Sequence, residues 1–177
     1  LRVDERQVLQ QASVIGAVFW AQALSALDPR AEVELPQLER KALALPRGED
    51  DGGLREYAFG HQLLHQVTYG TVLQRLKREL HGRVARWLAG LTGARAADFL
   101  ALTAEHFERA GDATQALRFH LRAAHHARDR YAHDAVLHHA TRGLSLLSDA
   151  QIDDAPVLRW DLHFLRVHGA GRCAAAK

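Results

Sequence analysis

Apolar residues recur at the three- and four-residue spacing of helices along most of the chain. In the first half, this spacing predicts helices over residues 4–15, 19–27, 35–45, 61–72 and 76–91. Asp4 is expected to cap the first helix with Gln7 at its third position, and Gly16 is expected to end it. The last of these helices would carry an apolar stripe at positions 76, 80, 84, 88 and 91.

A polar, glycine-rich stretch at residues 47–53 interrupts the helical pattern. Short segments at 42–46 and 55–59 flank it, and in the second one Tyr57 and Phe59 alternate with smaller residues, as in a half-buried strand. The sequence therefore predicts a small β-hairpin after three helices. That order is typical of a winged helix, so we expect residues 1–92 to form a winged-helix-like module and a connecting helix.

The second half has the pattern of paired antiparallel helices with alanine at many inner positions. Helices are predicted over residues 98–110 and 132–147. Asp112 is expected to cap a helix between them, with Gln115 at its third position, and another helix begins near Pro156. Such hairpins bury their apolar faces by stacking. We therefore expect a mainly α fold, with tetratricopeptide-like repeats over residues 93–177 that stop partway through a repeat.

Composition narrows the function classes further. The 177 residues carry a formal net charge of only +2, which gives no case for nucleic-acid binding from charge. The single cysteine, Cys173, allows no disulfide within the chain and suits a reducing cytoplasm. No apolar run approaches the ~20 residues of a membrane span, so no membrane partner is expected. The chain begins at Leu1 and contains no Met, and we interpret it as a fragment of a longer protein.

Four segments, in order along the chain, resemble one family of proteins. They are similar to the region that follows the ATPase core in bacterial STAND-type regulators. These include ATPase modules attached to class III adenylate or guanylate cyclase domains and regulators that end in LuxR-type DNA-binding domains. Gly60 and His65 depart from the pattern, because arginine is common at both positions in that family. The segments are residues 4–19, 57–69, 78–88 and 104–112.

The resemblance implies a regulatory segment without catalysis. No G-x-x-x-x-G-K-[ST] loop occurs in the chain, so ATP or ADP with Mg²⁺ would bind an ATPase core that lies upstream in the same protein. No cofactor is expected in this segment itself. The winged-helix-like part would close over the nucleotide site, and the repeats would bind a protein or a small-molecule inducer. The output would be a nucleotide cyclase or a transcription regulator.

His61 is the candidate nucleotide-sensing residue. It lies in an F-x-H-x-L pattern at residues 59–63, where the predicted strand gives way to a helix. In related STAND proteins a histidine at a similar place contacts bound ADP and holds the closed, inactive state. An imidazole at a helix start can donate to a phosphate oxygen, and the helix N-terminus favours the anion. The alternative is that His61 only caps its helix or packs against Tyr57.

The histidines and the possible nucleophiles give no catalytic or metal site. Twelve histidines occur, with adjacent pairs at 125–126 and 138–139, but no H-E-x-x-H motif is present and there is only one cysteine. We interpret these histidines as solvent-facing or groove-lining. No serine has a G-x-S-x-G setting. The tryptophans are expected in the core; they are Trp20, Trp87 and Trp160.

Three alternatives to the regulatory segment stay open at this point. A stand-alone tetratricopeptide-type adaptor would form helical hairpins throughout its first 90 residues, without a β-hairpin. A DNA-binding winged helix would use the 35–45 helix in the major groove, although its mixed charge suits phosphates poorly. A metal hydrolase is the third.

The basic residues between 75 and 86 are interrupted by Glu79, and we expect them on a solvated helix face.

Overall fold

The computed structural model describes residues 1–49, 52–92, 96–147 and 155–170, with side chains as far as residue 168. The described residues are mainly helical and include a small three-stranded antiparallel sheet, which confirms the predicted fold class at this level. Their contacts divide the chain into two units, Leu1–Trp87 and Leu88–Lys177. Among the described residues, no helix combines the length and the apolar character needed to cross a membrane.

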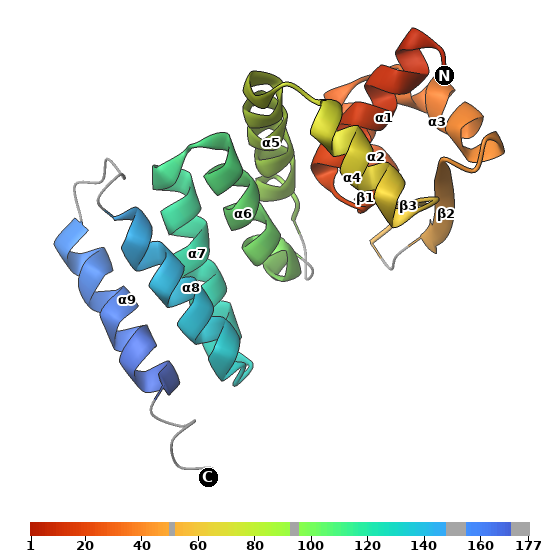
Figure 1. Ribbon diagram of the computed structural model, residues 1–177. Helices are drawn as coiled ribbons and strands as arrows, with labels where there is room; N and C mark the ends of the chain where they lie inside the picture. Colours follow the sequence, from red (N-terminus) through yellow and green to blue (C-terminus); the bar gives the residue numbers. More distant parts are fainter. Residues whose placement is uncertain (50–51, 93–95, 148–154, 171–177) are drawn as a thin grey trace. The chain divides into compact units, whose positions relative to one another are not determined.

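Unit 1 contains the sheet and the helices that pack around it (Figure 1). Its buried side chains include Leu9, Phe19, Leu24 and Leu38. The boundary with unit 2 falls inside its last helix. In chain order its elements are α1 (Val3–Ile15), β1 (Val18–Trp20), α2 (Ala21–Leu27), α3 (Ala31–Arg40), β2 (Ala44–Glu49), β3 (Arg55–Phe59), α4 (Gln62–Thr71) and α5 (Gln74–Ala89).

Strand β3 is the central strand of the sheet, and it pairs antiparallel with both β1 and β2. The predicted pair of strands is therefore present, but strand β1 was not expected. We expected a helix over residues 19–27, whereas Phe19 lies in β1 opposite Tyr57, and the helix begins at Ala21. The burial of Phe19 explains the difference, because its ring packs on Tyr57 at 5.9 Å and on Phe59 at 5.7 Å between centroids.

The helix expected over residues 35–45 also differs from the structure. Helix α3 starts earlier, at Ala31, and ends at Arg40, because Ala44 and Leu45 pair with β3. A backbone hydrogen bond from Leu43 to the carbonyl of Leu38 closes the helix end.

The start of α1 corrects the expected cap at Asp4. The helix begins two residues earlier than a cap at Asp4 would place it, at Val3, and the backbone N–H of Arg2 donates to the Glu5 carboxylate at 2.8 Å. Glu5 is only 1% exposed. The pKa of Glu5 is lowered to about 2 despite its burial. The largest cause is the hydrogen bond from the Lys41 ammonium at 2.7 Å, and the next is the bond from the Arg2 backbone N–H. Asp4 instead pairs with Arg30 at 2.7 Å.

Gly60 lies where two backbone segments meet at the end of β3. A Cβ atom at this position would be 2.1 Å from the carbonyl oxygen of Ala42, and the Gly60 N–H donates to the Leu43 carbonyl at 3.1 Å. No side chain fits without moving that backbone. Glycine at position 60 therefore has a steric reason in this chain.

Unit 2 is a series of antiparallel helices. Residues Ala96–Phe99 form a single 3-10 turn that leads into α6. Gly111 then ends α6 in the left-handed conformation, with φ of 86°, and the Asp112 side chain accepts from the Gln115 N–H at 3.0 Å. The predicted cap at Asp112 is confirmed. The helices are α6 (Leu100–Ala110), α7 (Ala113–Asp129), α8 (His133–Leu146) and α9 (Ala155–Ala170).

Close helix packing forms the core of unit 2. Leu117, Val136 and Leu162 are buried in one cluster with alanines of α7 and α8. A Cβ atom at Gly143 would lie 2.9 Å from a methyl group of Leu162, so α8 and α9 approach closely at this glycine. We had expected Trp160 in this core, but the structure leaves its side chain 68% exposed.

Substitution of Gly60 tests the close approach at the end of β3. We expect Gly60→Ala to lower the free energy of unfolding of unit 1 by about 1–3 kcal/mol, because the added methyl group must displace the Ala42 backbone. Urea unfolding followed by fluorescence would measure the change. Gly70→Ala is the matched control, since a Cβ atom there meets nothing within 4 Å and alanine favours the helix. Equal stability of the two variants would contradict the prediction.

Candidate functional site

His61 is the N-cap residue of α4. Its backbone is extended, with φ of −150° and ψ of 142°, and its Nδ1 atom accepts a hydrogen bond from the Leu63 N–H at 3.1 Å. The side chain thus satisfies one of the donors that a helix N-terminus leaves open. The capping role that we considered for His61 is present in the structure.

The capping bond determines which nitrogen of His61 faces other partners. Because Nδ1 accepts, the neutral ring carries its proton on Nε2, which is then a donor. His61 is an exposed residue, and the positive end of the α4 dipole lies at the same place. The residue can therefore cap its helix and donate to an anion at the same time.

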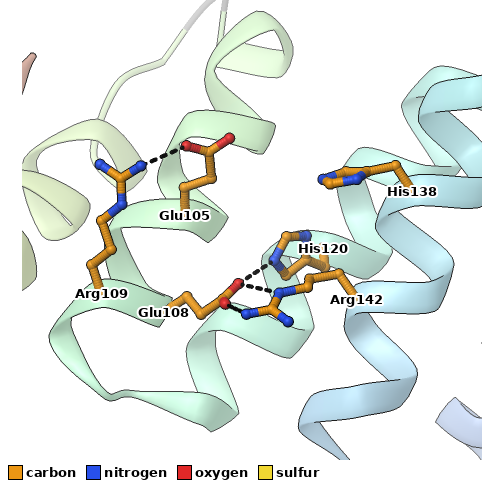
Figure 2. A pocket seen from close by; sticks show the side chains of 6 residues that line it. All are labelled: Glu105, Glu108, Arg109, His120, His138 and Arg142. Carbon is orange, nitrogen blue, oxygen red and sulfur yellow. Dashed lines mark hydrogen bonds and ion pairs between the residues drawn. The ribbon is translucent and has the colours of Figure 1, made fainter.

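A second polar site joins helices α6, α7 and α8 in unit 2 (Figure 2). Glu108 of α6 lies between two partners, the Nε2 atom of His120 at 3.2 Å and the guanidinium of Arg142. The second ring nitrogen of His120, Nδ1, lies 3.1 Å from the Nδ1 atom of His139. His120 and His139 are 1% and 7% exposed. The four side chains form one hydrogen-bonded row across three helices.

The row of hydrogen bonds assigns the tautomers. A carboxylate only accepts, so the Nε2 atom of His120 must be the donor to Glu108. If His120 is neutral, its Nδ1 atom is an acceptor, and His139 must donate to it from its own Nδ1 atom. In this arrangement the two buried Nδ1 atoms form one hydrogen bond while both rings stay uncharged.

Burial keeps both rings neutral near pH 7. Loss of solvent, with a smaller contribution from the nearby His138, lowers the pKa of His120 to about 4, although Glu105 opposes the shift. The pKa of His139 is likewise lowered to about 4. Burial is the largest cause, and the neighbouring His120 and His138 contribute less. Glu108 would favour a charged imidazole, but Arg142 already compensates its carboxylate.

A surface hollow borders this row of side chains. It has a volume of about 270 Å³ and is lined by His120 and His138 together with two ion pairs, Glu108–Arg142 and Glu105–Arg109. Small-molecule pockets usually range from ~300 to 1,000 Å³. The hollow is therefore too small to enclose a nucleotide, and every charge that lines it already has a partner.

The histidines differ from our expectation in one respect. We interpreted them as solvent-facing or groove-lining, but four of them are buried, although two of these, His120 and His139, also line surface hollows; the four are His81, His106, His120 and His139. His125 is partly buried and pairs with Asp161 at 2.9 Å. Within the described ranges, no group of three or more His, Cys, Asp or Glu side chains is placed to hold a metal ion.

The basic residues of α5 do not form a continuous patch. Arg83 donates to the backbone carbonyls of Ala26 and Leu27, and the Lys77 ammonium lies 4.2 Å from the centroid of the Tyr69 ring. Two of the candidate cations are thus engaged within unit 1. The remaining ones, Arg75, Arg78 and Arg86, are exposed.

Sequence analysis missed the His120–His139 contact because 19 residues separate the pair. A signal was present nonetheless. His120 follows Leu117 by three residues and precedes Ala124 by four, so it shares the buried stripe of α7. A histidine on such a stripe needs a buried partner.

The pH dependence of unit 2 tests the neutral pair. Because the folded-state pKa of each ring lies near 4, below the ordinary 6.5, the unfolded chain binds protons first as the pH falls. The stability of unit 2 should therefore be complete above about pH 6.5 and decline as the pH falls towards 4. Urea midpoints between pH 7.5 and 4.5 would measure it. A double variant, His120→Gln with His139→Gln, should lose this decline; an unchanged slope would contradict the assignment.

Comparison with known proteins adds no family to this picture. No protein-family model, curated protein or solved structure matches the chain. The function is therefore inferred from the residues and their geometry, together with the resemblance of the four sequence segments.

Proposed function

We propose that this chain is a non-catalytic regulatory segment of a cytoplasmic, multidomain signal-transducing ATPase of the STAND type. In this role, unit 1 is a winged-helix module that closes over the nucleotide site of an upstream ATPase core. Unit 2 is a set of tetratricopeptide-like hairpins that binds a partner or an inducer. Exchange of ADP for ATP shifts the population between closed and open arrangements.

The order of elements in unit 1 is the observation that carries the proposal. Three helices with one short strand between the first two precede a β-hairpin, and the sheet order is β1-β3-β2. This order is the one expected of a winged helix, and it supports the proposal. The antiparallel β2–β3 pair also argues against the alternative of helical hairpins throughout the first 90 residues.

The position of His61 supports the nucleotide role. Only Gly60 separates it from the end of β3, and it caps α4, a place like that which the resemblance implies for a residue that contacts ADP. Its Nε2 atom is the donor of the neutral ring, and it lies beside a helix N-terminus that favours phosphate.

The surface of α3 argues against DNA binding. In a DNA-binding winged helix this helix would enter the major groove. Its exposed side chains include Glu32 and Glu39 but only one cation, Arg40. Phosphates require clustered Lys or Arg, so this face would be repelled rather than bound.

Replacement of His61 in the full-length protein tests the nucleotide role. We expect His61→Ser to raise the dissociation constant for ADP about ten- to a hundredfold, because one hydrogen bond to a charged group is lost. Serine keeps an N-cap acceptor, so the stability of unit 1 should change little. Calorimetric titration with ADP would measure the affinity.

Two outcomes separate capping from nucleotide contact. His61→Ala removes both the cap and the imidazole, and should weaken both ADP binding and stability. If His61→Ser binds ADP like the wild type, His61 acts only as a cap and the nucleotide role of this residue fails. If the full-length protein binds no ATP or ADP, the proposed function fails as a whole.

A duplex-binding measurement tests the DNA alternative. The 177-residue chain should show no salt-dependent affinity for a fluorescent 20-base-pair duplex between 50 and 200 mM salt, because α3 offers no cluster of cations. Fluorescence anisotropy would measure this. Micromolar binding that weakens steeply with salt would favour the DNA-binding alternative instead.

A further inference from the structure

Helix α9 is apolar on two sides. Leu162 and Leu165 are buried against the rest of unit 2. A second stripe, which we call the outer face of α9, remains exposed. Its residues recur at helical spacing, and three of them are more than 60% exposed. The outer face consists of Val157, Trp160, Phe164 and Val167, which are 66%, 68%, 39% and 61% exposed.

An apolar stripe on a helix is normally buried against another element. The rings on the outer face are already ordered, because Trp160 stacks on Phe164 at 5.5 Å and Phe164 stacks on His168 at 4.0 Å between centroids. Ordered, exposed aromatic side chains are typical of binding hot spots, since little conformational entropy remains to be lost on association. The outer face is therefore shaped to receive a partner.

The charges beside the outer face determine the chemistry of that partner. One flank of the stripe carries Arg159, His163 and Arg166, with no acidic residue among them. Asp161 lies towards the other flank, where its carboxylate is bonded to His125 of α7. Among the residues that the structure describes, the charges beside the apolar stripe that lack an opposite partner are therefore cationic. Acidic side chains on a partner would complement it.

A second copy of the chain is a poor occupant for the same reason. In an antiparallel pair of α9 helices related by a two-fold axis, each flank faces its own counterpart. The flank with Arg159 and Arg166 would then lie against itself, and like charges would oppose the pairing.

We propose that the outer face of α9 binds an amphipathic helix whose apolar stripe is flanked by Asp or Glu. The apolar stripe of that helix packs on Trp160 and Phe164, and its acidic flank lies against Arg159 and Arg166. This names the kind of partner for unit 2, and rests on the binding role in the proposed function but not on its nucleotide role.

Two labelled 18-residue peptides test the proposal with the 177-residue chain. Both carry the same leucine stripe, flanked by Glu in one peptide and by Lys in the other. Fluorescence anisotropy should show the Glu-flanked peptide binding at least tenfold more tightly than the Lys-flanked one. Trp160→Ala with Phe164→Ala should weaken that binding at least tenfold. The matched control, Leu63→Ala with Val67→Ala, removes exposed apolar side chains of α4 and should change it less than twofold.

Charge reversal keeps the test decisive if the aromatic variant does not fold. Arg159→Glu with Arg166→Glu should reverse the preference and favour the Lys-flanked peptide. Equal binding of the two peptides, or no effect of either double variant, would overturn the proposal. Self-association that Trp160→Ala abolishes, measured by sedimentation, would assign the face to a second copy instead. None of these outcomes depends on ADP binding by the full-length protein, so the nucleotide role stands or fails separately.

Discussion

Strand β3 is held from both sides at its last residues, and the proposed role of unit 1 depends on this constraint. The Phe59 N–H donates to the Ala17 carbonyl at 3.0 Å, and the Gly60 N–H donates to the Leu43 carbonyl at 3.1 Å. The chain therefore leaves the sheet at a fixed point, and His61 follows at once as the cap of α4. A side chain that must meet a phosphate has to be placed in this way, on rigid elements rather than on a free loop.

Unit 2 combines a fixed interior with an open outer surface. The row from Arg142 through Glu108 and His120 to His139 joins three helices and satisfies its buried polar atoms with both rings uncharged. Helix α9 extends the same packing through Leu162, yet carries a second apolar stripe that the described residues leave exposed. In the role that we propose for unit 2, this packing would support the exposed stripe as a rigid surface for a partner.

Local patterns in the sequence predicted most helices, the β-hairpin and the cap at Asp112, because each depends on residues close together in the chain. Strand β1 could not be predicted in this way, since three residues become a strand only by pairing with β3. The same limit applies to the His120–His139 contact. The exposure of Trp160 was missed for another reason: an apolar helix face predicts burial, but not whether a partner covers it. His61 was chosen as a candidate from its position between strand and helix, and its capping bond could be foreseen only as one of two alternatives.

Hydrogen exchange in the full-length protein tests the central claim, that unit 1 responds to the nucleotide state, most directly. With ADP bound, the backbone amides at the start of α4, residues 62–66, should exchange more slowly than with a non-hydrolysable ATP analogue, because the closed arrangement covers them. Amides in the core of α7 should exchange equally in both states and serve as the internal reference. Identical exchange at residues 62–66 with the two nucleotides would contradict the claim that these helices belong to a nucleotide switch.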